Sequence, residues 1–269
     1  MFYIKTNDNV KIAVEDINPK ANKTVLFIHG WPMNHKIFEY QIDILSKIGV
    51  RCISMDIRGF GQSDCPASNY SYDRLAQDVY SVILNTRPKN LTLAGFSMGG
   101  AIAIRYMSLF KGHGVSKLAL LAAAAPAFTK RPDYPYGMSS ESVDMLIEQT
   151  YKDRPQMAAD FCKSLFAKSH SEEFKTWIKQ ICISSSGIGT IETAISLRDE
   201  DLRSELSNIK VKTGIFHGKL DQVCPYNFAL ALNEGISNSE LYEFKNSGHG
   251  VFYDELEDFN YKFIDFLNA

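Results

Sequence analysis

The chain has 269 residues, of which 45% are hydrophobic and 22% charged, so it can bury a sizeable core as one α/β domain with an insertion, or at most two small domains. Its formal net charge is −2 and it has no long basic block, which argues against nucleic acid or an anionic membrane as its main partner. The sequence has no apolar stretch long enough to span a membrane and no apolar segment near its start, so we expect neither a membrane span nor a signal peptide.

Predicted strands and helices alternate through the first part of the chain. A two-stranded hairpin around Asn7–Asn9 comes first, and the later strands are apolar and β-branched without polar alternation, as in a buried parallel sheet. Apolar residues at helical spacing indicate the helices, with Ser71 and Gly49 at helix ends. The predicted strands are 2–6, 10–17, 24–28, 51–55, 91–96 and 115–121, and the predicted helices are 34–48, 72–85 and 101–109.

The alternation stops at Ala122 and resumes near residue 209. The intervening segment contains no predicted strand, and its predicted helices are 139–150, 155–168, 171–183 and 188–198. Strands at 211–216 and 240–244 and helices at 225–232 and 256–267 follow. A helical insert between two βα units predicts a cap over the carboxyl edge of the sheet, where ligands of open α/β sheets bind. We therefore predict a core of residues 1–121 and 209–269 and a helical cap at 122–208.

The cysteines are odd in number and none is spaced as C-x-x-C. This pattern predicts free thiols, with no zinc or redox motif and no bound metal. Free thiols are typical of a reducing compartment, so we expect a cytoplasmic protein. The five cysteines are Cys52, Cys65, Cys162, Cys182 and Cys224.

The segment Gly95–Gly99 is a G-x-S-x-G pentapeptide between a predicted strand and a predicted helix. A strand, a sharp turn and a helix in this order form a nucleophile elbow, in which the serine hydroxyl stands clear of both elements. Glycines flank the serine because a Cβ there would meet neighbouring backbone. The start of the helix also directs free N–H groups toward whatever Ser97 attacks. The pentapeptide alone also describes an ordinary glycine-rich turn, so its context must decide.

A serine nucleophile needs a base, a group that orients the base, and donors for the developing oxyanion. In an elbow hydrolase the acid and then the histidine follow the serine along the chain. His249 lies between two glycines just after the last predicted strand, and we interpret it as the base rather than as a solvated loop histidine. Asp221 follows the penultimate strand and is interpreted as the acid rather than as an ordinary turn aspartate. The other histidines after Ser97 are expected elsewhere: His113 at the opposite end of the sheet, His170 between cap helices and His217 within the sheet.

Four further motifs in this order resemble the α/β-hydrolase superfamily over nearly the full chain. They are H-G-x-P at 29–32, D-x-R-G-x-G-x-S at 56–63, G-x-x-D at 218–221 and the terminal G-H at 248–249. Within the superfamily, H-G-W-P with G-x-S-M-G-G is similar to cofactor-free haloperoxidases, also called perhydrolases, and to their arylesterase relatives. The resemblance implies an α/β-hydrolase fold, with a mostly parallel central sheet, helices on both faces and a helical cap inserted late in the chain.

The resemblance and the physics of the elbow together suggest further roles. The backbone N–H groups of Trp31 and Met98 are expected to form the oxyanion hole, where losing one donor typically costs about 3 kcal/mol. Trp31, Phe128 and Val223 are expected to contact the substrate, although each could be ordinary core.

Residues of the other motifs are interpreted as structural. His29 is expected to form hydrogen bonds under the oxyanion loop, and Asp56 and Arg58 to stabilise loops as an ion pair.

The sequence thus predicts a serine hydrolase that acts on small carboxylic esters through an acyl-enzyme, without metal or other cofactor. The Trp31 carbonyl, held by Pro32, is expected to accept a hydrogen bond from hydrogen peroxide, so that perhydrolysis accompanies hydrolysis. A lactonase or amidase of the same fold, or a protein that binds a small ligand without turnover, are alternatives, because acyl preference depends on the shape of the cap. Ser97 excludes the family members that use an aspartate nucleophile. The natural substrate and the oligomeric state are not predicted.

Overall fold

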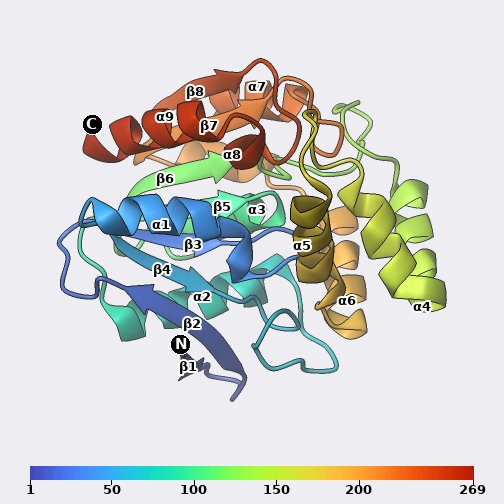
Figure 1. Ribbon diagram of the computed structural model, residues 1–269, viewed down its shortest axis with the longest axis horizontal. Helices are drawn as coiled ribbons and strands as arrows, with labels where there is room; N and C mark the ends of the chain where they lie inside the picture. The colour runs from blue at the N-terminus through green and yellow to red at the C-terminus, as the bar shows by residue number, and fades with distance from the viewer.

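The computed structural model describes residues 1–269, and an eight-stranded sheet runs through its centre (Figure 1). The strand order is β1-β2-β4-β3-β5-β6-β7-β8, and β2 alone runs against the other strands. The prediction of a mostly parallel sheet is confirmed. The strands are β1 (Phe2–Lys5), β2 (Lys11–Ile17), β3 (Thr24–Ile28), β4 (Arg51–Met55), β5 (Leu91–Phe96), β6 (Val115–Leu121), β7 (Lys212–Gly218) and β8 (Ser239–Phe244).

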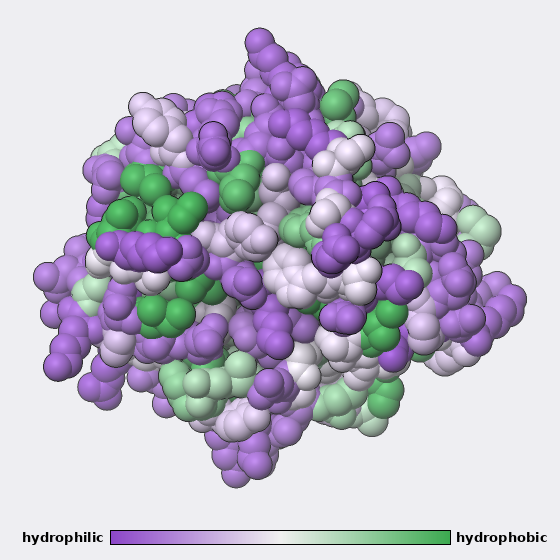
Figure 2. Space-filling model, in the orientation of Figure 1, coloured by the Kyte–Doolittle hydropathy of each residue, from purple (hydrophilic) through white to green (hydrophobic).

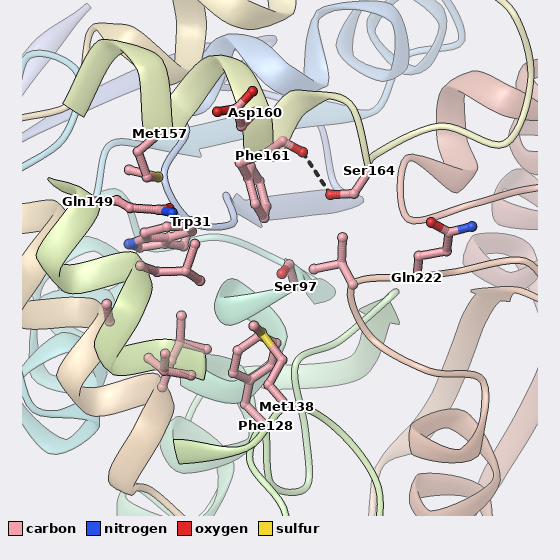
Figure 3. A pocket seen from close by; sticks show the side chains of 15 residues that line it. Trp31, Ser97, Phe128, Met138, Gln149, Met157, Asp160, Phe161, Ser164 and Gln222 are labelled. Carbon is pink, nitrogen blue, oxygen red and sulfur yellow. Dashed lines mark hydrogen bonds between the residues drawn. The ribbon is translucent and has the colours of Figure 1, made fainter. Parts of the chain in front are cut away.

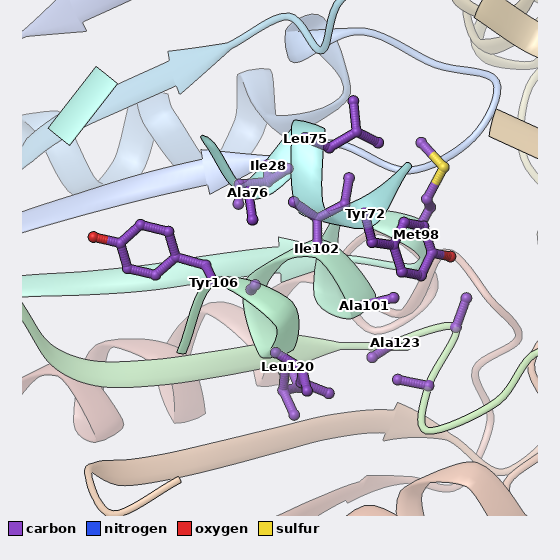
Figure 4. Close-up of a cluster of buried hydrophobic side chains, with 14 of the residues drawn as sticks. Ile28, Tyr72, Leu75, Ala76, Met98, Ala101, Ile102, Tyr106, Leu120 and Ala123 are labelled. Atoms are coloured by element: carbon purple, nitrogen blue, oxygen red, sulfur yellow. The ribbon is translucent and has the colours of Figure 1, made fainter. Parts of the chain in front are cut away.

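Helices cover both faces of the sheet. On one face lie α1 (Glu39–Lys47) and α9 (Leu256–Asn268); on the other lie α2 (Tyr72–Thr86), α3 (Met98–Leu109) and α7 (Asn227–Gly235) (Figure 1). Successive residues of a strand point to opposite faces, so Leu26 and Ile28 of β3 join one buried cluster while Val25 and Phe27 join the other. Figure 4 shows part of the first cluster, where Ile102 of α3 lies among side chains of α2 and the sheet. Hydrophilic residues cover most of the face drawn in Figure 2, and the hydrophobic residues on this face form only small patches.

Three helices form the predicted insertion between β6 and β7. They are α4 (Ser140–Cys162), α5 (Glu172–Ile183) and α6 (Gly187–Asp199), and they stand beyond the carboxyl ends of the parallel strands (Figure 1). Short helices complete the chain: η1 (His35–Phe38), which precedes α1, and two that the sequence pattern does not predict, η2 (Arg203–Asn208) and α8 (Val251–Asp254). No helix combines the length and the apolar character needed to cross a membrane.

Helix α4 corrects two predicted boundaries. The two helices expected at 139–150 and 155–168 are joined across a kink at Asp153, whose φ of −156° and ψ of 80° are not helical. The Asp153 carboxylate accepts a hydrogen bond from the Gln156 N–H, so it caps the second half just before Pro155. The helix ends at Cys162, six residues earlier than predicted, because the following segment bonds elsewhere; for example, the Ala167 N–H donates to the Asp254 carboxylate.

Candidate active site

Ser97 lies at the turn between β5 and α3, with φ of 53° and ψ of −119°. A serine adopts this conformation only at a steric cost, which the surrounding structure must offset. A Cβ on Gly95 would lie 2.3 Å from the Gly99 carbonyl oxygen, and one on Gly99 would lie 2.2 Å from the Ile28 carbonyl oxygen. Only glycine fits at both positions, because the atoms in the way belong to the backbone. The turn therefore has the geometry that the G-x-S-x-G pattern predicts.

Asp221 and His249 lie in contact at the same edge of the sheet. His249 Nδ1 is 2.8 Å from Asp221 Oδ2, and both side chains are buried. Asp221 Oδ1 accepts hydrogen bonds of 2.8 Å from the N–H groups of both Val223 and Cys224. Burial alone would raise the pKa of the Asp221 carboxyl, but His249 and His217 hold it well below its ordinary value. The carboxylate is therefore ionised and fixed in orientation.

The other ring nitrogen of His249 has no partner. His249 Nε2 is buried and makes no hydrogen bond, so it is not bonded to the Ser97 hydroxyl in this structure. A neutral His249 that donates Nδ1–H to Asp221 carries its lone pair on Nε2, as a general base requires. Catalytic hydrogen bonds are often long without substrate and shorten in the reacting complex. The two residues that the sequence analysis assigned as acid and base are thus brought together, with the basic nitrogen available.

His217 is a second histidine beside the acid, and the sequence analysis missed this contact. It is fully buried at the end of β7, as expected, but its Nε2 lies 2.8 Å from the Cys224 carbonyl oxygen and 3.3 Å from Asp221 Oδ2. A carbonyl oxygen only accepts, so His217 Nε2 carries a proton and presents it to the Asp221 carboxylate as well. The i,i+4 spacing of the two residues across a turn is a weak signal that could have suggested this contact.

The loop after β3 brings Trp31 to the serine. A Cβ on the neighbouring Gly30 would lie only 2.9 Å from Ser97 Cβ, so this loop lies directly against the elbow. The Trp31 N–H has no hydrogen-bond acceptor within the chain, and Met98 is the first residue of α3, where N–H groups lack helical partners. The two N–H groups assigned to the oxyanion hole therefore come from adjacent segments. The Trp31–Pro32 peptide bond is cis.

His29 joins two loops beneath this site. Its Nε2 accepts a 2.9 Å hydrogen bond from the Ile57 N–H, so its Nδ1 is the protonated nitrogen and donates to the Gly30 carbonyl oxygen at 2.9 Å. Complete burial lowers the pKa of His29 to about 4, so the ring is neutral at ordinary pH. These contacts agree with the structural role that the sequence analysis gave this residue.

The ion pair expected between Asp56 and Arg58 is absent. Asp56 Oδ1 instead lies 2.7 Å from His35 Nδ1, while the Arg58 guanidinium pairs with Asp78 and Asp8. Both residues still tie loops to their surroundings, but they do so with other partners. The Asp56 carboxylate also accepts hydrogen bonds from the His35 and Gln62 N–H groups, so its oxygens are satisfied without Arg58.

A cavity of about 320 Å³ opens above Ser97, between the sheet edge and the cap (Figure 3). Trp31, Phe128 and Val223, the predicted substrate contacts, all line it. The Trp31 indole N–H donates a 2.8 Å hydrogen bond to the Thr190 carbonyl oxygen in α6. The indole ring packs edge-on against the Phe161 ring, with ring centroids 5.2 Å apart. Cap residues that the sequence analysis did not identify supply most of the remaining wall. The cap residues in the wall are Met138, Val143, Leu146, Gln149, Met157, Asp160, Phe161, Ser164, Ala194 and Leu197, and Gln222 completes the lining.

The lining is mainly apolar, and its polar groups are few. Ser97 is a buried polar group of the wall, whereas Gln149, Asp160 and Gln222 are exposed. Asp160 is the only carboxylate in the lining, and no lysine or arginine belongs to it. No group of three or more histidine, cysteine, aspartate or glutamate side chains is arranged to hold a metal ion. Such a cavity suits an uncharged, largely apolar ligand with one reactive polar group near Ser97.

Comparisons with known proteins agree with this geometry. Residues 23–256 match the sequence profile of the alpha/beta hydrolase fold family. The chain is 51% identical over 267 residues to the AB hydrolase superfamily protein YisY of Bacillus subtilis, covering 99% of each chain. It is 26% identical to a bifunctional esterase/perhydrolase of Acinetobacter calcoaceticus, covering 100% of both. A solved esterase structure from Exiguobacterium antarcticum is 47% identical and superposes with a TM-score of 0.96, covering 99% of each chain.

Proposed function

Because the chain belongs to the α/β-hydrolase family, we propose that it is a serine-dependent hydrolase of small carboxylic esters that works through an acyl-enzyme on Ser97. The observation that carries this proposal is the Asp221–His249 hydrogen bond of 2.8 Å, which leaves the second imidazole nitrogen free at the edge of the sheet where the elbow serine lies. The likeness to a solved esterase at 47% identity supports the same reaction class.

In the proposed reaction, His249 Nε2 takes the proton of the Ser97 hydroxyl as its oxygen attacks the ester carbonyl carbon. The Trp31 and Met98 N–H groups would donate to the oxyanion of the tetrahedral intermediate. The protonated His249 then gives its proton to the leaving alcohol oxygen, and the C–O bond breaks. A water molecule, deprotonated in turn by His249, then attacks the acyl carbon. The bond to Ser97 Oγ breaks, His249 returns the proton to that oxygen, and the carboxylic acid leaves. Asp221 keeps the imidazole in the required tautomer throughout.

The lining of the cavity favours uncharged substrates with short to medium apolar acyl or alcohol groups. Its wall is apolar and lacks a cation that could pair with a carboxylate on the substrate. A matched series of p-nitrophenyl esters, from acetate to octanoate, with a succinate half-ester as the charged control, tests this selectivity. We expect the charged ester to have the lowest kcat/KM among esters of similar size.

The direct test of the mechanism is Ser97→Ala. We expect a loss near 10⁶ in kcat, by analogy with other serine triads, and fluorophosphonate labelling of the wild type at Ser97 alone. A burst of nitrophenol equal to the enzyme concentration would distinguish an acyl-enzyme from a protein that only binds a ligand. A folded Ser97→Ala variant that keeps a tenth of the wild-type rate would rule out this nucleophile.

Perhydrolysis is the second activity that we propose. The similarity to a relative named as a bifunctional esterase/perhydrolase supports this proposal. Hydrogen peroxide would replace water in the second step, so that the acyl group leaves Ser97 as a peracid. The Trp31 carbonyl oxygen accepts no hydrogen bond within the chain, so it is free to accept one from peroxide. The assay combines peroxide, an acetate ester and bromide, and follows bromination of monochlorodimedone. A signal no greater than that of Ser97→Ala would leave a plain esterase.

A further inference from the structure

Two cysteine thiols of the cap lie in contact, away from the proposed catalytic residues. Cys162 is the last residue of α4 and Cys182 lies near the end of α5, and their sulfur atoms are 3.4 Å apart. All five cysteines are free, and this is the only pair of thiols in contact. A disulfide has an S–S length of about 2.0 Å, so the sulfurs must approach by about 1.4 Å for the bond to form.

Solvent reaches this pair from one side only. Cys162 is half-buried and lines a surface cavity of about 440 Å³, whereas Cys182 is fully buried behind it. Cys162 is therefore the thiol that a dissolved oxidant meets first, and Cys182 lies directly next to its sulfur. This is the arrangement of an attacking and a resolving cysteine.

The surroundings of Cys162 are cationic. Lys168 and Lys179 line the same cavity and form no ion pair, whereas Lys163 and Lys175 there are paired with carboxylates, and His170 is paired with Asp254. The hydrogen bond with Cys182 lowers the pKa of Cys162, burial opposes this change, and Lys179 contributes to lowering it. A thiolate on Cys162 is favoured by these contacts, and the thiolate is the nucleophilic form.

We propose that Cys162 and Cys182 form a dithiol that hydrogen peroxide oxidises to a disulfide joining α4 to α5. The Cys162 thiolate attacks one peroxide oxygen, the O–O bond breaks, and the leaving hydroxide takes up a proton as water, so Cys162 becomes a sulfenic acid. The Cys182 sulfur then attacks the Cys162 sulfur, the S–O bond breaks and a second water leaves. In sum, two thiols lose two electrons and two protons, and one peroxide is reduced to two waters.

The modification is reversible and independent of ester hydrolysis. A thiol reductant returns both cysteines to the reduced state by exchange through a mixed disulfide. The site adjoins the substrate cavity, because Phe161, next to Cys162, forms part of the cavity wall. A peroxide-using enzyme would meet the oxidant as a substrate, but the proposal stands whether or not perhydrolysis occurs, since peroxide is added in the test.

The experiment uses the full chain with Cys65→Ser, which removes the one exposed thiol and so prevents linkage between molecules. The reduced protein is treated with a few equivalents of hydrogen peroxide, its remaining thiols are alkylated, and tryptic peptides are mapped by mass spectrometry. Cleavage after Lys163 and after Lys179 places the two cysteines on different peptides. We expect an intact mass lower by about 2 Da, a linked pair of peptides, and full reversal by dithiothreitol.

Single variants show the order of the steps. Cys182→Ser is expected to leave a sulfenic acid on Cys162 that dimedone traps, and Cys162→Ser is expected to leave Cys182 unoxidised. Cys52→Ser, at a buried thiol elsewhere, is the matched control and retains the linkage. A Cys65→Ser chain whose Cys162 proceeds to sulfinic acid without linkage, or whose Cys162 and Cys182 stay unmodified, would overturn the proposal. That result would be independent of any esterase assay.

Discussion

Replacing Asp221 by asparagine tests the proposed acid with little change in shape. The carboxylate accepts two backbone N–H bonds at Oδ1, which an asparagine oxygen can keep, so the loop is expected to retain its conformation. At Oδ2 an amide NH₂ would face the Nδ1–H of His249 and the Nε2–H of His217, so donors would face donors. His249 escapes this conflict by moving its proton to Nε2, which removes the lone pair that must accept the proton of Ser97.

The expected loss follows from that change of tautomer. The same replacement in another serine hydrolase lowers kcat by about 10⁴, which corresponds to about 5.5 kcal/mol in the activation free energy. We expect a similar loss here, smaller than for Ser97→Ala, because the acid orients the base and stabilises its charged form. The assay is steady-state hydrolysis of p-nitrophenyl acetate, with the melting temperature as the check on folding.

The matched control is Asp160→Asn, which changes the one carboxylate in the cavity lining. Asp160 is exposed and interacts with Lys163 and Gln156, so its variant is expected to keep kcat within a few fold. The reasoning would be refuted by an Asp221→Asn enzyme that keeps a tenth of wild-type kcat, or by an equal loss in Asp160→Asn.

Three further predictions concern the support of the site. His217→Gln is expected to lower kcat about tenfold with little change in KM and to shift the pH profile of kcat, whereas a purely structural role would change only the melting temperature. Gly95→Ala is expected to give no folded protein, because its Cβ would meet backbone at 2.3 Å; soluble, active protein would contradict the geometry. Burial lowers the pKa of His29 to about 4 in the folded protein. Between about pH 6.5 and pH 4, the unfolded chain therefore carries a proton on His29 that the folded protein lacks, and the free energy of unfolding falls as the pH falls through this range. Urea denaturation measures how much the free energy of unfolding drops between pH 7 and pH 4.5, and we expect this drop to be about 2–3 kcal/mol smaller in His29→Gln than in the wild type. An equal drop in both proteins would argue against a neutral His29.

Local patterns predicted most of the core. Buried strands such as β3 were located to the residue, because apolar, β-branched runs between turn residues have few alternative structures. The resemblance to esterases and perhydrolases is likewise confirmed by the comparisons. The cap was predicted less well. Two separate helices were predicted at 139–150 and 155–168, yet Asp153 caps the second half and the chain continues as one helix through a kink.

The sequence by itself determined the elements that backbone chemistry restricts: the glycine-flanked turn at Ser97, the chain order of serine, acid and histidine, and the parallel sheet that places such loops at one edge. Each can be recognised from short motifs, local patterns and their order along the chain. Only the tertiary structure decided which side chains meet across long separations. The hydrogen bond from Trp31 to the Thr190 carbonyl oxygen and the contact between Cys162 and Cys182 both depend on how the cap helices and loops pack. That packing is set by the shapes of many side chains together rather than by any local pattern.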